Sequence, residues 1–347
     1  RLVGSEMCIR DRSIPSSTGF GSISYINGGT MDNDGWEIEF STNNMIKRGD
    51  WSVDLSLNFS NYVNTIIDLD ENVLHNYNAD FNYSNGSYLN RFQVNNSFGS
   101  IYGFRYKGVY QYDTYQPDKP DATAPVVRDA NGNVVLDGSG DPIPMYFAYG
   151  TTNEYRFRGG DAIYEDINHD GTIDELDIVY LGNSNPKFDG GFGTTIRWKR
   201  LSLNVFFNYR VGGKIINYGR MYSESMYNTE NQSVSTNWRW RKDGDVTEIP
   251  RALFQSGYNW LGNDRFVEDG SFLRLKQLTL NYSFDPKLLK KAHLNTLNLS
   301  LTLNNMFTVT KYTGADPEIS PNNIGVSEDK NRTPRSRYFT FGLTIGI

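Results

Sequence analysis

The feature that most constrains this chain is an alternation of apolar and polar residues with a period of two. In the segment 51–59, every second residue is apolar, and Ser, Asp or Asn stands between. Such alternation is typical of antiparallel β-strands with one apolar and one polar face. No long segment shows the 3.6-residue period of a helix, and one short helix is expected at 286–292. The alternation recurs at 36–40, 102–112, 201–209, 278–284, 297–303 and 339–347.

The connections between these segments differ sharply in length. Counting back from the last strand, long connections at 311–337, 211–271 and 113–187 alternate with short turns such as Lys199-Arg200. Short turns on one side and long loops on the other are typical of outer-membrane β-barrels. Loops of this length are uncommon in compact soluble domains. We therefore predict an all-β fold, an antiparallel transmembrane β-barrel in part, with lipid against its apolar face.

Composition agrees with this fold class and excludes others. The chain contains 23 Tyr and 20 Phe among 347 residues, which argues against disorder. No apolar run reaches the ~18 residues that a membrane helix requires. The net charge is −6 and basic residues do not cluster, so a nucleic-acid partner is not expected. Aromatic girdles of a membrane barrel belong at strand ends, which is where Trp36, Trp51, Trp198 and Tyr209 lie.

The single cysteine, Cys8, lies in a segment of unusual character. Residues 2–11, LVGSEMCIRD, resemble the translated transposase adapter of a sequencing library. On this interpretation residues 1–12 are an artefact, and residues 13–347 are the native part of the chain. The native part then has no cysteine, so we expect neither a disulfide nor thiol chemistry in it.

The segment 166–177 is the sharpest motif for chemistry. Oxygen-bearing side chains occupy loop positions 1, 3, 5, 9 and 12, and Gly171 stands at position 6, as in an EF-hand calcium loop. Ile173 can anchor the loop to its surroundings, whereas His169 is expected to point outward. The alternative is an Asx-rich turn without an ion. We predict structural Ca²⁺ or a similar hard cation, held by Asp166, Asn168, Asp170, the carbonyl of Thr172, Asp174 and Asp177.

Catalytic patterns are weak throughout the chain. The histidines His75, His169 and His293 are isolated, and neither H-E-x-x-H nor G-x-S-x-G occurs. Carboxylates are common, but nothing sets one pair apart as a general acid and base. We therefore assign no enzyme activity.

An aromatic and basic segment inside the long connection 211–271 offers a place for a ligand. Exposed aromatic rings can stack on sugars or contact peptides, and Arg239 and Arg241 can bind carboxylates. The alternative is that these side chains pack the loop onto itself. The predicted substrate-binding residues are Trp238, Trp240, Tyr258 and Trp260.

Several short motifs, taken in order along the chain, resemble one protein family. They lie at 33–38, 51–59, 99–106, 160–171, 182–188, 266–276, 304–307 and 312–318. Each is weak alone, but their number and order are similar to SusC/RagA-type TonB-linked outer-membrane proteins (TonB-dependent receptors) of Bacteroidetes. The loop at 166–177 matches the family motif at Asp166, Asn168, Asp170, Gly171 and Asp174.

This resemblance implies the C-terminal part of a large, plugged, 22-stranded barrel in the cell outer membrane. It implies import of glycan oligosaccharides or peptides, together with a SusD-like surface lipoprotein. It also implies energy supplied by TonB through an N-terminal region, with plug, TonB box and signal peptide expected upstream of this chain. Three alternatives remain open: a passive porin-like or adhesive barrel, a secreted calcium-dependent carbohydrate-binding β-domain, and a glycan-cleaving enzyme with two carboxylates at glycosidase spacing in a groove.

Overall fold

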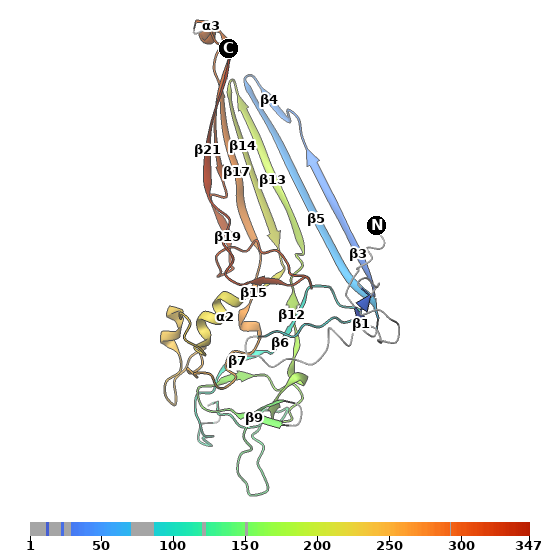
Figure 1. The fold of residues 1–347 in the computed structure, drawn as a ribbon, viewed down its shortest axis with the longest axis vertical. Coiled ribbons are helices and arrows are strands. Elements are labelled where there is room, and N and C mark those ends of the chain that lie inside the picture. Colours follow the sequence, from blue (N-terminus) through green and yellow to red (C-terminus); the bar gives the residue numbers. More distant parts are fainter. Residues whose placement is uncertain are drawn as a thin grey trace.

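The computed structural model describes residues 12–13, 22–23, 29–70, 87–119, 123–149, 152–291 and 293–347. Cys8, nearly all of the segment 1–12, and His75 lie outside the described residues. The described residues form two regions, a long antiparallel sheet and a lobe of folded loops at one end of it (Figure 1). The name "loop lobe" is used below for the described residues of 87–187, 212–271 and 311–337.

The sheet has nine strands, and its main path runs in the order β21-β18-β17-β14-β13-β5-β3. The short strands β4 and β19 pair with β5 and β17. Sheet neighbours follow one another along the chain, as they do in an up-and-down barrel wall. Within the described residues the sheet is open, with β3 and β21 at its edges. The bounds are β3 Gly29–Ser41, β4 Ile46–Arg48, β5 Trp51–Leu69, β13 Phe188–Trp198, β14 Leu201–Val211, β17 Phe272–Ser283, β18 Thr296–Asn304, β19 Thr308–Thr310 and β21 Tyr338–Gly346.

The register of the sheet brings the apolar residues of neighbouring strands onto one face. Leu203 is opposite Leu280, and Leu280 is opposite Leu301 on its other side. Leu301 is in turn opposite Phe341, so one apolar row crosses four strands. Phe341 is 65% exposed, which is typical of a face that meets lipid and not a protein core.

Aromatic side chains gather at two levels of this face. Trp51, Trp198 and Tyr209 lie at or near strand ends, as the sequence predicts, whereas the prediction of a strand end at Trp36 is wrong, because β3 continues on both sides of it. Trp51 stacks on Trp198 with ring centroids 5.6 Å apart, at the end of β5 and β13 that carries the tight turns. Trp36 stacks on Phe59 at 5.0 Å, nearer the loop lobe. Phe59 lies eight positions after Trp51 on β5, a distance of about 26 Å along the strand. Two aromatic girdles at such a separation fit the apolar band of a membrane barrel.

The two ends of the sheet differ as the connection lengths predict. The tight turn at Lys199-Arg200 and the helix α3 (Pro286–Lys291) lie at one end, with the C-terminus (Figure 1). The long connections meet at the other end and form the loop lobe. Among the described residues, no helix is both long enough and apolar enough to traverse a bilayer.

The prediction of one strand across 102–112 is wrong. The chain forms two short strands there, β6 (Ser100–Gly103) and β7 (Tyr106–Val109), in separate sheets. β6 pairs with β12 (Val179–Asn183), and β7 pairs with β10 (Ala162–Tyr164). Tyr102, Phe104 and Tyr110 are buried in the lobe, and Tyr106 and Tyr112 are partly buried, so the alternation of this segment reflects packing against protein and not exposure to lipid.

The loop lobe contains most of the buried core. Its largest apolar cluster is built from residues 89–178 and Leu261, and a second cluster packs around Met221 and Phe266. The remaining elements are β8 Tyr146–Tyr149, β9 Thr152–Arg156, β11 Thr172–Ile173, β15 Lys214–Asn217, α2 Tyr218–Ser225, β16 Val267–Asp269, β20 Ser327–Asp329 and the 3-10 helices η2 Glu175–Asp177, η3 Val234–Trp238 and η4 Asp264–Phe266. Two further short strands, β1 Arg12–Ser13 and β2 Ser22–Ile23, pair with each other.

Candidate functional site in the loop lobe

The EF-hand-like loop folds as a tight turn against the core of the lobe. Gly171 has φ of +86° and Ile173 is fully buried, so the predicted turn and the predicted anchor are confirmed. A Cβ on Gly171 would lie 2.6 Å from Val127, so only glycine fits this close approach. His169 is exposed at φ of +58°, as expected for a position that points outward. The segment after the loop is a 3-10 helix, η2, and not an EF-hand helix.

The carboxylates of this loop accept backbone hydrogen bonds. Asp166 Oδ2 accepts from Gly171 N at 2.9 Å, and Asp170 Oδ1 accepts from Thr172 N at 2.8 Å. Asp177 accepts from Ile167 N and from Asp174 N, so both of its oxygens are engaged. Burial raises the pKa of Asp177 to about 6. Asp174 caps η2 by accepting from Leu176 N at 2.7 Å.

Asp166 carries the feature that fits a cation. Its Oδ1 atom is buried and has no hydrogen-bond partner within the described part of the chain. Burial raises the pKa of Asp166, and the neighbouring Asp170 carboxylate adds to the rise. An unpartnered buried carboxylate oxygen of this kind is what a hard cation would satisfy. However, the described residues contain no cluster of three or more carboxylate, imidazole or thiol groups placed to hold a metal, so Ca²⁺ stays a prediction.

The four predicted substrate-binding aromatics do not form one surface. Trp238, at the end of η3, is 68% exposed. Trp240 donates from Nε1 to the Gln111 carbonyl at 3.2 Å and lies against Gly160, where a Cβ would meet the indole at 2.2 Å. Of these residues, Trp238 is therefore the one whose ring is open to a ligand.

The other two aromatics pack inside the lobe. Tyr258 stacks on Phe147 with centroids 3.8 Å apart and makes an edge contact with Tyr155. Trp260 contacts Tyr222 and Tyr227 at 6.2 and 5.3 Å. The alternative that these rings pack the loop onto itself therefore describes Tyr258 and Trp260 well.

A buried ion pair joins the aromatic segment to the motif at 160–171, and sequence reasoning missed it. Asp161 is fully buried, and Arg251 donates to its two oxygens from Nε at 2.6 Å and from Nη2 at 3.2 Å. The Tyr155 hydroxyl donates to Asp161 Oδ2 at 2.8 Å. Burial opposes the charge on Arg251, but the pair with Asp161 raises its pKa above the ordinary value. The signal was present in the motif Gly160-Asp161, whose partner ninety residues away has no local signature.

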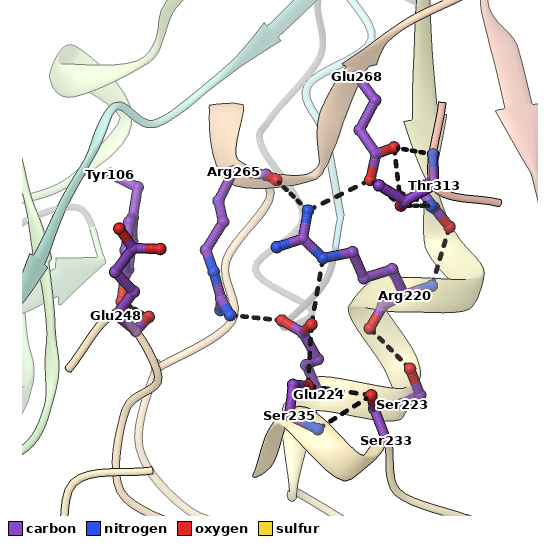
Figure 2. Close-up of polar contacts among 11 residues, drawn as sticks. Tyr106, Arg220, Ser223, Glu224, Ser233, Ser235, Glu248, Arg265, Glu268 and Thr313 are labelled. Carbon is purple, nitrogen blue, oxygen red and sulfur yellow. Dashed lines mark hydrogen bonds and ion pairs between the residues drawn. The ribbon is translucent and has the colours of Figure 1, made fainter. Parts of the chain in front are cut away.

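A second charged network holds helix α2 against the rest of the lobe (Figure 2). Arg220 lies between two carboxylates, donating to Glu224 at 3.1 Å and to Glu268 at 3.2 Å. Arg265 pairs with the other oxygen of Glu224. Glu268 accepts a hydrogen bond from Thr313 N at 2.8 Å, which links β16 to the loop 311–337. Two cations and two carboxylates balance here, and such paired, hydrogen-bonded charges are tolerated when buried.

A third network lies where the loop 311–337 meets the sheet. Arg274 of β17 is buried and donates to Glu318 at 2.8 Å, and it also pairs with Asp316. Arg335 reaches the other oxygen of Glu318 at 2.8 Å. The motifs at 266–276 and 312–318, which the sequence shows only as separate matches, are therefore two halves of one ion-pair cluster.

Comparisons with known proteins agree with this architecture. No family model matches the chain. The chain is 31% identical to TonB-dependent receptor P39 of Formosa agariphila over 96% of its own length and 32% of that receptor. It is 27% identical to TonB-dependent receptor P3 of the same organism, over 99% of the chain and 31% of the receptor. It is 26% identical to TonB-dependent receptor SusC of Bacteroides thetaiotaomicron, over 63% of the chain and 21% of SusC.

Solved structures show the same fold. A structure of the RagAB peptide transporter superposes with a TM-score of 0.63 at 24% sequence identity, over 98% of this chain and 32% of that one. The chain thus spans about a third of the length of P39, of P3 and of this structure.

An antiparallel sheet with an apolar side, with packed loops at one end, is part of the wall of a transmembrane β-barrel, and the RagAB structure shares this fold. The chain belongs to the TonB-dependent receptors, with SusC of Bacteroides thetaiotaomicron among its relatives, and its place is the outer membrane. The predicted family, fold class and location are confirmed. The relatives are named as receptors and a transporter, which supports a role other than catalysis.

Proposed function

We propose that this chain forms part of the barrel wall and external loops of an importer that takes up glycan oligosaccharides or peptides. The observation that carries the proposal is the one-sided architecture. An apolar face suited to lipid continues, at one end only, into a lobe with its own packed core. The names of the relatives support uptake driven through TonB, and the similarity to the RagAB peptide transporter supports peptides among the candidate substrates.

The partners proposed for the importer are those that its relatives suggest. A SusD-like surface lipoprotein would dock on the loop lobe, and outer-membrane lipid would cover the apolar face of the sheet. TonB would act through a region outside this chain, because the chain spans about a third of P39. A secreted carbohydrate-binding domain fits less well, because apolar rings such as Phe341 lie exposed on the sheet.

The solvent exposure of each aromatic side chain decides which of them we propose as a ligand contact. Trp238 would stack on the substrate directly, with the neighbouring Arg239 and Arg241 available for polar contacts. Trp240, Tyr258 and Trp260 would act by holding the loops in place, since each already packs on protein. A substrate contact of this kind needs an exposed aromatic face and donors beside it.

The calcium proposal rests on the donor set of the loop. Asp166, Asn168, Asp170, Asp174 and the Thr172 carbonyl are oxygen ligands of the type that Ca²⁺ takes, and Asp166 Oδ1 lacks a partner among the described residues. The ion would supply positive charge that holds the loop closed, and Asp177 would close the loop from its far end. Terbium luminescence on the purified receptor tests this. An Asp170→Ala variant should lose the signal, and an unchanged signal would refute the proposed ligands.

Uptake in cells tests the import proposal. We expect labelled oligosaccharide or peptide to enter cells that carry the intact receptor. Uptake should stop when tonB is deleted, or when the lipoprotein gene beside the receptor gene is deleted. A matched strain with a deletion in an unrelated surface lipoprotein serves as the control. Uptake that persists without TonB would contradict the importer and favour a passive barrel.

A further inference from the structure

Residues of helix α2 line a cavity. The cavity has a volume of about 310 Å³. This is at the lower end of the size range of small-ligand sites, about 300–1,000 Å³, and is large enough for a single sugar ring. It is lined by Gly219, Tyr222, Ser223, Glu230, Asn231 and Asn331.

The lining has the chemistry of a site for a polyhydroxylated ligand. Tyr222 is 40% exposed, and its ring is held by Tyr218, stacked at 5.7 Å, and by the edge contact with Trp260. Tyr222, Glu230, Asn231 and Asn331 are all exposed, so the Tyr222 hydroxyl, the two amides and the Glu230 carboxylate are accessible to a ligand. An aromatic ring accepts the C–H face of a sugar, while amides and a carboxylate bind its hydroxyls.

The charge of the cavity restricts the ligand. Glu230 is the one ionisable carboxylate among the lining residues, and no Lys or Arg lines the cavity. An anionic sugar would meet an unpaired carboxylate and no cation, so it is disfavoured. A peptide's terminal carboxylate would meet the same obstacle. A neutral ring fits best.

The backbone that carries the cavity residues is held in place. A Cβ on Gly219 would lie 2.2 Å from Asn331 Oδ1, so only glycine lets this amide approach the helix. Asn331 is held at φ of +59°, and its N–H donates to Asp329 Oδ1 at 3.0 Å. The ion pairs of Arg220 with Glu224 and Glu268 fix α2 in place (Figure 2). Fixed groups lose little freedom when a ligand binds.

We propose that this cavity binds one neutral pyranose ring of an oligosaccharide. The proposal rests on the proposed import function and names its substrate class as neutral glycan. Tyr222 provides the stacking face, and Asn231, Asn331 and Glu230 bind the hydroxyls. Ser223 is engaged with the Arg220 carbonyl, to which its hydroxyl donates at 3.0 Å, so it contributes shape to the wall.

Saturation-transfer NMR on the complete receptor in detergent tests the site. The probes are the methyl glycosides of glucose, galactose, mannose and xylose, with trialanine as the peptide competitor. We expect at least one glycoside to bind, and trialanine not to displace it. Tyr222→Ala and Gly219→Ala should each weaken binding by about tenfold or more.

The Gly219→Ala variant separates binding from folding. Alanine has a higher helix propensity than glycine, so the variant should fold at least as well as the parent. Its added Cβ should displace the Asn331 side chain. Tyr180→Ala is the matched control, because Tyr180 is an exposed tyrosine of the lobe outside the cavity, and it should bind as the parent does.

The outcomes are distinct. No glycoside binding to the parent, displacement by trialanine, or unchanged binding in both cavity variants would overturn the cavity assignment. TonB-dependent uptake measured in the same strains would then still stand on its own. Conversely, TonB-independent uptake would refute the importer even if the glycoside binds in the cavity.

Discussion

The sheet and the loop lobe use similar aromatic and aliphatic side chains in opposite ways. On the sheet, Phe341 is 65% exposed, whereas Phe147 in the lobe is completely buried. The sheet satisfies its backbone by strand pairing and leaves its apolar side chains to the bilayer. The lobe lies outside the bilayer, where water forces apolar side chains into a core. The comparison teaches that one chain is folded for two solvents, and that a residue's role follows from the region it belongs to.

Charged residues follow the same division. The lobe buries ion pairs such as Asp161 with Arg251, whereas Arg197 pairs with Asp54 on the polar face of the sheet. Buried pairs are sensitive to loss of one partner, because the remaining charge cannot be solvated. The lobe should therefore respond to single substitutions much more strongly than the sheet does.

The largest expected effect is truncation of the lobe core. Phe147→Ala removes a fully buried ring that stacks on Tyr258, and should destabilise the lobe by about 3–5 kcal/mol. Phe341→Ala, its counterpart on the sheet, removes a ring that lies in detergent or lipid and should change lobe stability by less than about 0.5 kcal/mol. Limited proteolysis of the lobe in denaturant measures both. Equal losses of lobe stability in the two variants would contradict the difference between lobe and sheet.

Loss of the buried ion pair should have a similar effect. Asp161→Asn leaves the Arg251 guanidinium without its charge partner and should cost about 3–5 kcal/mol of lobe stability. The control is Asp113→Asn, which breaks an exposed pair with Arg158 whose atoms are 3.7 Å apart, and should cost about 0–1 kcal/mol. The same proteolysis assay applies. A control as damaging as Asp161→Asn would contradict the importance of burial.

A charge on the lipid face sharpens the comparison from the other side. Phe341→Lys places an ammonium on the apolar row near the middle of β21 and should destabilise the barrel in bilayers by about 2–4 kcal/mol. Thr340→Lys puts the same charge on the opposite face, beside Thr302, and should be tolerated. Unfolding in lipid vesicles, followed by gel mobility, measures the two. If both variants behave alike, the two faces are wrongly assigned.

Acid should release the loop 311–337 before it disturbs the sheet. Burial alone would raise the pKa of Asp316, but the Arg335 and Glu318 N–H groups and the Arg274 guanidinium lower it below its ordinary value of 3.8. A depressed pKa stabilises the fold above the unfolded value, and the contribution is lost as pH falls through the folded value. The protection of this loop against hydrogen exchange, relative to the intrinsic exchange rate at each pH, should therefore fall below about pH 4. In the Asp316→Asn variant, the loss of protection at low pH should be smaller than in the parent. An unchanged loss would show that other carboxylates cause it.

The smallest effect is expected at the exposed tryptophan. Trp238→Ala should leave lobe stability within about 0.5 kcal/mol, because its ring is 68% exposed. Tyr258→Ala should cost several times more, because it removes the ring that covers Phe147. Thermal unfolding of the two variants ranks them. Substrate binding that falls in Trp238→Ala without a stability change would support its proposed contact.

Much of the sheet could be predicted from the sequence, because alternation is a local property. The run 51–59 became the first half of β5, and the Leu-rich run 297–303 became β18. The calcium-like loop was also readable in part, since Gly171 and Ile173 do what their positions predict. The sequence predicted less well what Asp177 does. Its carboxylate accepts hydrogen bonds from the Ile167 and Asp174 N–H groups, and these contacts depend on how η2 packs.

The lobe resisted prediction because its contacts join distant residues. Asp161 and Arg251 are ninety positions apart, and the Gln111 carbonyl that Trp240 contacts is farther still from it. The alternation at 102–112 correctly indicated strand structure, but the segment forms two short strands, β6 and β7, and not one strand of the barrel wall. A short alternating sequence does not show whether lipid or protein will cover its apolar face.

By itself, the sequence determined which segments become strands, which of their faces is apolar, and which turns are short, because a two-residue period and turn length are written locally in the chain. Only the tertiary structure decided which aromatic rings stay open and which carboxylates are paired. Exposure and ion pairing depend on what folds against a residue, and here the partners come from loops that meet only when the lobe has assembled.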